Sequence, residues 1–536
     1  MGLARTLAVT LTGLQGHLVD VEAHCASGLP AFTLVGLPDA AVRESRDRVR
    51  AALTTCGVTW GEQRLTVNLS PADLPKTGTG LDLALALAVL GARGKLPRGA
   101  VAHLERTVHI GELGLDGSLH PVRGVLPAVH AAVAAGFTEI VVAAGGAAEA
   151  ALVPGATITA AAHVGELVLR YGGQLSGPAL ELVRRAQTQA APGRARPGAA
   201  APLPGAAGPG GRRGATAPDL AEVVGQAEAR HALEVAAAGG HHLLMVGPPG
   251  AGKTMLAERL PSILPPLEGE DAVAVTSLHS LAGAFNPEAG LVTDPPLRAP
   301  HHTATRAAII GGGSGSPRPG EVSLAHRGVL FLDEAPEFPS SLLDCLRQPL
   351  ESGEITIDRV GGRATYPAAF QLVLAANPCP CGKGSGRGLD CTCTSLQRRR
   401  YLTRLSGPLL DRIDIQVEVG AVDAGDLVRP TPAEPSAVVG ARVKRARRRA
   451  AARLAPTPWR LGSQVPGSYL RSPESGTRPE LVARLMGSLE RGELSLRGVD
   501  RVLRLAWTLA DLGERDAPTL TDLGAALALR ATGLRR

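Results

Sequence analysis

The sequence predicts a multidomain α/β protein: an N-terminal α/β domain, a P-loop core built on a parallel sheet, and a C-terminal α-helical domain. The chain has 536 residues, too many for one hydrophobic core, so two to four domains are expected. Strand-like apolar stretches alternate with helical ones on both sides of a segment rich in Ala, Pro and Gly. An apolar strand leads into GPPGAGKT at 247–254, and from about residue 430 the pattern is mainly helical.

The composition break at 186–218 divides the chain. This segment, AQTQAAPGRARPGAAAPLPGAAGPGGRRGATAP, has no apolar periodicity and is predicted to be a flexible linker. We therefore assign residues 1–175 to the N-terminal domain, 219–425 to the P-loop core and 430–536 to the C-terminal helical domain. In the N-terminal domain, AFTLVGL and RLTVNLS are predicted strands, and the helix between them ends at Gly57.

Composition excludes some classes of protein. Hydrophobic residues make up 44% and charged residues 20%, as in an ordinary globular protein. Aromatic residues make up only 2%, so a surface that stacks bases on aromatic rings is not expected. No apolar run approaches the ~20 residues of a membrane span, and the N-terminus alternates like a strand, which disfavours a signal peptide. We expect a cytoplasmic protein, in which seven cysteines favour free thiols over a disulfide framework.

GPPGAGKT matches the pattern G-x-x-x-x-G-K-[ST] in full. It follows the apolar strand LLMV and precedes a helix, which is the context of a P-loop. Its glycines let backbone N–H groups turn inward around phosphates at the start of the helix. The predicted ATP-binding residues are therefore Gly247, Pro248, Pro249, Gly250, Ala251, Gly252, Lys253 and Thr254.

The stretch GVLFLDE at 328–334 supplies the acidic partners of the P-loop. A buried strand would deliver Asp333, together with the Thr254 hydroxyl, to Mg²⁺. Glu334 would act as general base on the attacking water, while Lys253 reaches the β- and γ-phosphate oxygens. The motif pair thus predicts ATP hydrolysis with ATP and Mg²⁺ as cofactors.

Four of the seven cysteines lie within the stretch NPCPCGKGSGRGLDCTC. Two close pairs separated by a Gly-rich loop suit a tetrahedral metal, and thiolates favour Zn²⁺. The C-x-C spacing is tighter than the usual C-x₂-C, so free thiols or a redox pair remain the alternative to a structural zinc site. The candidate ligands are Cys379, Cys381, Cys391 and Cys393.

The net charge of +7 is concentrated in two runs, QRRRYLTR at 397–404 and ARVKRARRRAAAR at 441–453. Both suit nucleic acid or an acidic partner surface, and both equally suit a solvated helix face.

Long stretches of the core resemble one family. DLAEVVGQAEARHALEVAAAGGHHLLMVGPPGAGKTMLA, RAPHHTATRAAIIGGG, PGEVSLAHRGVLFLDEAPEF and SGPLLDRIDIQVEV are similar to the YifB/ComM family of magnesium-chelatase-type AAA+ ATPases. The resemblance covers nearly the whole chain outside the linker and implies a hexameric ring. It also implies that Asn377 orients the attacking water and that Arg412 is an arginine finger for the neighbouring subunit. Arg497 matches the lid arginine known as sensor 2, with Arg501 as its rival.

The resemblance extends to a pore hairpin and to an N-terminal domain like that of Lon proteases. GEITIDRVGGRATYPA is a predicted hairpin around Gly361–Gly362, and Arg359 and Arg363 beside its tip would contact DNA phosphates or only pack between subunits. PKTGTGLD at 75–82 resembles the Lon active-site loop, but Gly80 replaces the nucleophilic serine. Leu126 replaces the catalytic lysine, so a protease is not expected.

The family resemblance implies a hexameric helicase that drives DNA branch migration in recombination of transforming DNA. Single-stranded or branched DNA is the expected partner, with a possible protein partner at the Lon-like domain. The alternative is a ring that remodels a protein partner, as the magnesium-chelatase ATPase does.

Overall fold

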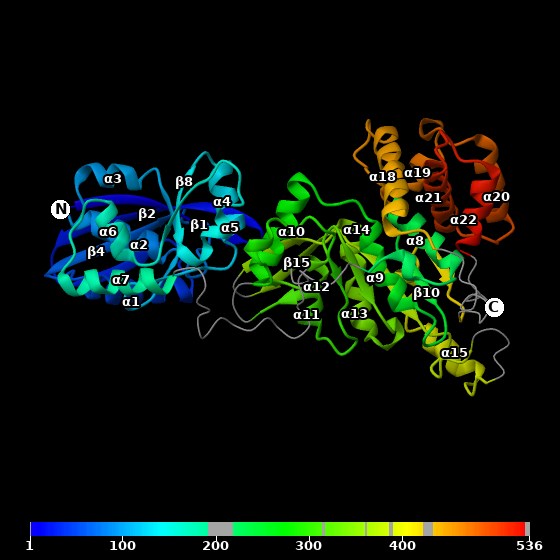
Figure 1. Cartoon of the computed structure of the whole chain (residues 1–536), viewed down its shortest axis with the longest axis horizontal. Helices are drawn as coiled ribbons and strands as arrows, with labels where there is room; N and C mark the ends of the chain where they lie inside the picture. The colour runs from blue at the N-terminus through cyan, green and yellow to red at the C-terminus, as the bar shows by residue number, and fades with distance from the viewer. Residues whose placement is uncertain are drawn as a thin grey trace.

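The computed structural model describes residues 2–190, 218–313, 317–359, 362–384, 390–421 and 433–530. Three parts follow one another along its longest axis (Figure 1). The N-terminal domain lies at one end, the P-loop core in the middle and the C-terminal helices at the other end. The α/β fold class predicted from the sequence is confirmed.

The N-terminal domain is built on a mixed seven-stranded sheet of order β3-β4-β2-β1-β5-β8-β9. Strands β1 and β2 form a long antiparallel hairpin, β2 pairs antiparallel with β4, and the remaining neighbours are parallel. The strands are β1 (Gly2–Thr12), β2 (Gln15–Ser27), β3 (Ala31–Val35), β4 (Gln63–Ser70), β5 (Val108–Ile110), β8 (Glu139–Ala143) and β9 (Thr157–Ala161).

Helices cover both faces of this sheet, because side chains of each strand point alternately to opposite faces. On β1, Ala4 and Ala8 face helices α1 (Ala40–Thr55), α2 (Asp82–Ala92) and α6 (Val164–Arg170), whereas Leu7 and Val9 face α4 (Val125–Ala134). All eleven residues of α2 are buried, which explains its continuous apolar sequence. The short elements α3 (Arg98–Leu104), α5 (Ala147–Ala150), β6 (Glu112–Leu113) and β7 (Leu119–His120) complete the domain.

Helix α7 (Gly177–Ala190) differs from the predicted boundaries. It begins after residue 175, and residues 186–190 continue the helix into the segment predicted as linker. These five residues are Ala, Gln and Thr, and Ala and Gln favour a helix over a coil. The rest of the predicted linker, 191–217, lies outside the described residues.

The core is a parallel five-stranded sheet of order β11-β14-β17-β10-β18. Its central strands are fully buried on both faces, as their continuous apolar sequences require. The strands are β10 (Leu243–Val246), β11 (Leu297–Arg298), β14 (Val329–Leu332), β17 (Gln371–Ala376) and β18 (Ile415–Glu418).

Helices α8 (Ala227–Gly239) and α9 (Lys253–Ile263) pack against one face of the core sheet. The opposite face contacts other helices, namely α10 (Gly269–Ala282), α11 (Arg306–Ile310), α12 (Glu321–Leu324), α13 (Ser340–Cys345) and α16 (Gly407–Leu410). Helices α14 (Arg347–Ser352) and α15 (Ser395–Leu402) complete the described helices of the core, and a two-stranded ribbon joins β12 (Gly311–Gly312) to β13 (Arg318–Pro319).

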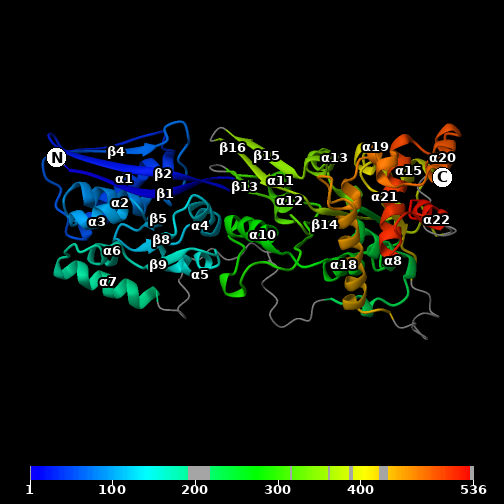
Figure 2. The same cartoon turned by 90° about the horizontal axis from the view of Figure 1, so that it is seen from above.

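The predicted hairpin is present as β15 (Glu354–Arg359) and β16 (Gly362–Pro367). Its register corrects the predicted turn by one residue, because Arg359 pairs with Gly362, which therefore belongs to the second strand. Residues 360–361, between the two strands, lie outside the described residues. The hairpin lies on the side of the core nearest the N-terminal domain (Figure 2). Gly13, between β1 and β2 of that domain, approaches the hairpin so closely that a Cβ on it would lie 2.5 Å from the Thr365 carbonyl oxygen.

The N-terminal domain also contacts the core through α4, α5 and α10. The Ser280 hydroxyl of α10 donates a hydrogen bond to the half-buried Glu149 carboxylate of α5, which also accepts a hydrogen bond from the Leu126 amide at 2.9 Å. Burial raises the pKa of Glu149. Leu281 packs against Gly124, where any side chain would clash with it.

Residues 433–530 contain helices and no described strand. They are α18 (Ser436–Arg453), α19 (Gly467–Leu470), α20 (Pro479–Glu490), α21 (Leu496–Leu512) and α22 (Leu520–Ala528). Helices α18 and α21 share a hydrophobic cluster with α8, and α18 also packs on α9, so this domain covers the α8–α9 side of the sheet. Among the described residues, no helix is both long and apolar enough to cross a membrane.

Candidate functional site

The P-loop occupies the carboxyl edge of the core sheet. Strand β10 is fully buried and ends at Val246, so the chain turns at 247–252 before α9 begins. Gly250 and Gly252 have φ values of 77° and 90°, in the left-handed region that glycine tolerates. A Cβ on Gly250 would meet nothing within 4 Å, so the space beside its backbone is open to a phosphate, while Gly247 approaches the carbonyl of Val419 too closely for any side chain.

Lys253 is buried at the first position of α9 and connects the loop to a second strand. Its ammonium donates to the carbonyls of Gly247 at 2.7 Å and Pro248 at 2.9 Å, and to the Asn377 side-chain oxygen at 3.2 Å. Burial lowers the pKa of Lys253, and the nearby Asp333 and Glu334 carboxylates oppose that shift.

The acidic pair lies beside the loop. The Thr254 hydroxyl donates to one oxygen of Asp333 at 2.7 Å, and the Glu334 amide donates to the other at 2.9 Å. Glu334 itself has a φ of 49°, an unusual conformation for a residue with a side chain. This turn directs the two carboxylates, which are adjacent in sequence, to different positions.

Sheet order explains why these groups meet. β14, β17 and β10 are neighbours, and each ends at the same edge with one of the predicted residues: Asp333 after β14, Asn377 after β17 and Gly247 after β10. The ammonium, hydroxyl, carboxylates and open backbone loop at this edge are the donor set that a magnesium-bound nucleoside triphosphate requires. ATP and Mg²⁺ therefore fit the residues present.

His302 is a member of this edge that the sequence predictions did not assign. Its Nδ1 lies 3.7 Å from the Glu334 carboxylate, and its ring contacts that of His301, with 4.1 Å between the ring centres. Both histidines belong to the stretch RAPHHTATRA, which is part of the family resemblance but has no recognised catalytic spacing. The pair of adjacent histidines is the sequence feature from which a functional role of this stretch could have been predicted.

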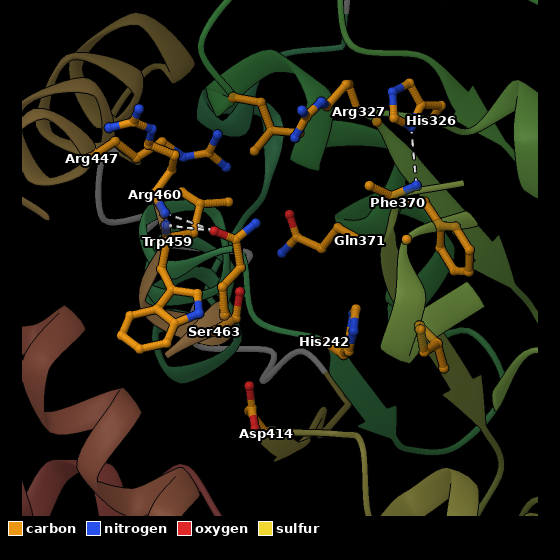
Figure 3. Close-up of a pocket in the computed structure, with 18 of the residues that line it drawn as sticks. His242, His326, Arg327, Phe370, Gln371, Asp414, Arg447, Trp459, Arg460 and Ser463 are labelled. Atoms are coloured by element: carbon orange, nitrogen blue, oxygen red, sulfur yellow. Dashed lines mark hydrogen bonds between the residues drawn. The ribbon is translucent and has the colours of Figure 1, made fainter. Parts of the chain in front are cut away.

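The two predicted arginines lie at the opposite edge of the sheet. A cleft of 1460 Å³ is lined there by His242, Gln371 and Asp414, which lie at the amino ends of β10, β17 and β18. Figure 3 shows these three side chains across from Trp459, Arg460 and Ser463. Arg412 and Arg497 line the same cleft, and no P-loop residue does.

Arg412 is largely buried at this edge. It forms an ion pair with Glu351 and donates to the Pro408 carbonyl at 2.5 Å, while its Nε has no partner among the described residues. Burial lowers its pKa, and the neighbouring Arg347 and Arg497 add to the effect.

The two candidate lid arginines differ sharply in exposure. The Arg497 side chain is 70% exposed and pairs with Asp411 at 2.8 Å. The Arg501 side chain is 7% exposed and lies 3.8 Å from both Asp411 and Asp414. Arg497 is therefore accessible to a neighbouring molecule, whereas Arg501 is part of the domain interior.

The two basic runs also differ. In α18, Arg442, Arg445, Arg449 and Arg453 form ion pairs with acidic residues of this chain, and Arg447 is bonded to the Ala237 carbonyl. The positive charge of that run is therefore largely neutralised by acidic residues of the same chain. In α15, Arg398, Arg399 and Arg400 are exposed, and the described residues offer them no ion pair.

The four predicted cysteine ligands are brought together directly after Asn377. Cys379 is buried and the other three are partly buried, and all are free thiols. Burial raises the pKa of the Cys379 thiol, while the backbone N–H groups of Lys383 and Thr392 lower that of Cys381.

The loop of the N-terminal domain contrasts with the P-loop. Lys76 is completely buried and its ammonium is bonded to the Pro71 carbonyl. Within 4 Å, a Cβ on Gly80 would meet only Val122, at 3.7 Å. Leu126 belongs to α4 and lies in the hydrophobic cluster between this helix and the sheet. No nucleophile or lysine base is present at either position.

The fold and this site define the class: the chain is a P-loop protein with the sheet order of the AAA+ ATPases. Its residues 219–427 match the family model described as magnesium chelatase, subunit ChlI; residues 21–146 and 433–530 match models of subunit ChlI of Mg-chelatase and of its C-terminal part. The chain belongs to the YifB/ComM family of magnesium-chelatase-type AAA+ ATPases.

Relatives match along the whole chain. An uncharacterized protein of Mycobacterium tuberculosis is 48% identical over 100% of both chains. The competence protein ComM of Haemophilus influenzae is 38% identical over 99% of this chain and 98% of its own. Lon protease 2 of Bacillus subtilis is 33% identical over 146 residues, 26% of each chain, which agrees with a Lon-like N-terminal domain.

Proposed function

We propose that this chain hydrolyses ATP in a homo-hexameric ring and uses that energy to drive DNA branch migration in recombination of transforming DNA. The observation that carries the proposal is the assembly of Lys253, Thr254, Asp333, Glu334 and Asn377 at one edge of the core sheet. Similarity to the competence protein ComM along the full chain supports the DNA part.

Each residue has a distinct chemical task. The backbone of 247–252 and Lys253 would hold the phosphates of ATP, with Thr254 and Asp333 as ligands of Mg²⁺, which neutralises phosphate charge when bound. Glu334 accepts a proton from the attacking water, and Asn377 fixes the orientation of that water.

Positive charge for the transferred phosphoryl group comes from a second subunit. Arg412 lies at the edge of the sheet opposite its own P-loop, which supports a role at the site of a neighbour, and a closed ring is the arrangement that gives every subunit such a neighbour. Arg497 is exposed beside it and would act on the same neighbouring nucleotide.

The first experiment is steady-state ATP hydrolysis with and without single-stranded, duplex or four-way-junction DNA. Branched or single-stranded DNA should stimulate turnover several-fold, and Glu334→Gln should reduce it by ~10²-fold or more because the general base is lost. Hydrolysis that no DNA changes would contradict the DNA proposal and favour the alternative, a ring that remodels a protein partner bound at the Lon-like domain.

The hairpin β15–β16 is the proposed DNA contact within the ring. Arg363 is 73% exposed and lies 3.7 Å from Asp358, and Arg359 follows on the other strand. Reversing both charges should abolish stimulation by DNA while leaving basal hydrolysis intact, because phosphate attraction becomes repulsion. The matched control is Arg484→Glu on α20, and unchanged stimulation in the hairpin variant would remove the hairpin from the proposal.

We also propose that the protein is cytoplasmic, because all seven cysteines are free thiols, as in a reducing compartment.

A further inference from the structure

The four cysteine sulfurs after Asn377 have the spacing of a single tetrahedral metal site. The Cys379 sulfur lies 3.3 Å from that of Cys381 and 3.6 Å from that of Cys391, and the last two are 3.7 Å apart. With Cys393 included, all four sulfurs lie within 4.8 Å of one another. Four thiolates at about 2.3 Å from one Zn²⁺ lie roughly 3.8 Å apart, which matches these separations.

We propose that Cys379, Cys381, Cys391 and Cys393 bind one Zn²⁺ ion as a closed structural site. Sulfurs 3.3 Å and more apart are not disulfide-bonded, since that bond is about 2.05 Å long. A complete set of four protein ligands leaves no open position for a substrate, so the site has a structural role. Thiolate ligands select zinc over the hard Mg²⁺ of the nucleotide site.

The ion would brace the P-loop, in the sense that it would hold in place the residues that contact that loop. Gly382, in the turn between the first cysteine pair and the Gly-rich loop, has a φ of 76° and faces the P-loop residue Pro249. A Cβ on Gly382 would lie 2.6 Å from two ring atoms of Pro249. Because Asn377 directly precedes the cysteines and contacts Lys253, the ion fixes the turn that touches the P-loop at both points.

The same ion would also fix the start of α15, the helix that carries the exposed Arg398, Arg399 and Arg400. Thr394 follows the last ligand and caps α15, with its hydroxyl and backbone both paired to Gln397 in a capping box. The zinc site thus joins the nucleotide-binding loop to the start of α15.

Zinc content tests the site directly, without reference to ATP hydrolysis. The full-length protein, desalted and analysed for metal by mass spectrometry, should contain about one zinc per chain. Cys381→Ser with Cys391→Ser should lose it, whereas the control Cys345→Ser should keep it, since Cys345 lies outside the cluster. Less than a tenth of one equivalent in the wild type after zinc reconstitution, iron in place of zinc, or equal zinc in the double variant would overturn the proposal.

A second measurement uses the wild-type chain and so does not depend on the folding of a variant. Protein reconstituted with Co²⁺ should show the visible absorption of a tetrahedral thiolate complex, and one equivalent of Zn²⁺ should abolish it. Absence of that absorption at saturating Co²⁺ would contradict a four-thiolate site.

The bracing role rests on the proposed ATPase function and has its own test. Gly382→Ala keeps all four thiols and should retain zinc, but it should reduce ATP affinity or turnover by about tenfold by displacing Pro249. Gly407→Ala is the control, because a Cβ there meets nothing within 4 Å. Full zinc with unchanged ATP binding and hydrolysis in Gly382→Ala would overturn the bracing role while leaving the metal site in place.

Discussion

Two loops of this molecule look alike and differ in what surrounds them. The loop at 247–254 opens α9 in the core, and the loop at 75–82 opens α2 in the N-terminal domain. Each contains glycines and a buried lysine whose ammonium is bonded to a backbone carbonyl and whose pKa is lowered by burial.

The two loops differ in the side chains that neighbouring elements place beside them. Around Lys253, two adjacent strands end beside Asp333 and Asn377, so the loop faces the polar groups of the proposed hydrolytic site. In the N-terminal domain, the positions that the Lon resemblance makes catalytic hold Gly80 and the buried Leu126. Two loops of similar composition therefore differ in the groups that converge on them, and the chemistry of a loop depends on those groups.

The largest expected effect concerns Arg412, the proposed arginine finger for a neighbouring subunit. Arg412→Ala should reduce ATP turnover by about 10³-fold, the lower limit for loss of an arginine finger. Mixing this variant with Lys253→Met should restore part of the activity, because an intact Lys253 in one subunit then meets an intact Arg412 in the next. Steady-state hydrolysis across mixing ratios measures this.

The control for that experiment is Arg445→Ala, which removes an exposed ion pair with Glu514 and should change turnover by less than twofold. If mixed subunits show no more activity than the average of the two variants, the neighbouring-subunit role of Arg412 is wrong, and the P-loop edge would be complete within one chain.

The two lysines provide the sharpest test of the comparison itself. Lys253→Met should reduce hydrolysis by ~10²–10³-fold, as expected when one charge-stabilising donor is removed. Lys76→Met keeps most of the buried volume and should leave hydrolysis within about twofold, because the N-terminal loop takes no part in it. Equal losses in both variants, with both proteins folded by circular dichroism, would show that the loops are functionally coupled.

Sequence patterns predicted one edge of the core well, for a physical reason. Parallel strands place their carboxyl ends together, so a motif after each strand specifies a shared site without knowledge of the fold. Lys253, Asp333 and Asn377 each follow this rule. The four cysteines were predicted because both halves of the site lie within fifteen residues of one another.

Other features depend on long-range packing that no local pattern encodes. The pairing of α18 arginines with acidic residues of α21 and beyond is invisible in the run ARVKRARRRAAAR. Arg497 and Arg501 lie one turn apart on the same face of α21, so the exposure of the first, at the start of the helix, and the burial of the second depend on how neighbouring elements pack around that turn. The proximity of His302 to Glu334 depends on a loop whose path the sequence does not specify.

A smaller effect should appear in both domains at acid pH. His109 in the N-terminal domain and His326 in the core are buried, and burial lowers the pKa of each to about 3. Above pH 6.5 both folded and unfolded histidines are neutral and contribute nothing. As the pH falls from 6.5 toward 3, only the unfolded chain takes up the proton, so the folded state is destabilised.

At pH 5 this amounts to about 2 kcal/mol for each histidine. Calorimetry should show lower unfolding temperatures at pH 5 than at pH 7 for the transitions of both domains. His109→Gln and His326→Gln should each reduce that pH dependence in its own domain only. A pH dependence confined to the core would show that His109 is accessible to protons in the folded state.

The smallest expected effect comes from returning a serine to the N-terminal loop. Gly80→Ser fits without strain, because a Cβ there meets only Val122 at 3.7 Å and Gly80 lies outside the left-handed region. The variant should fold, hydrolyse ATP at the wild-type rate and cleave no peptide, since a serine without a base is not activated. Adding Leu126→Lys should cost several kcal/mol instead of supplying that base, because Leu126 is fully buried among apolar residues. Casein hydrolysis by Gly80→Ser above that of the wild type would contradict this account, because it would mean that a base other than residue 126 survives beside the loop.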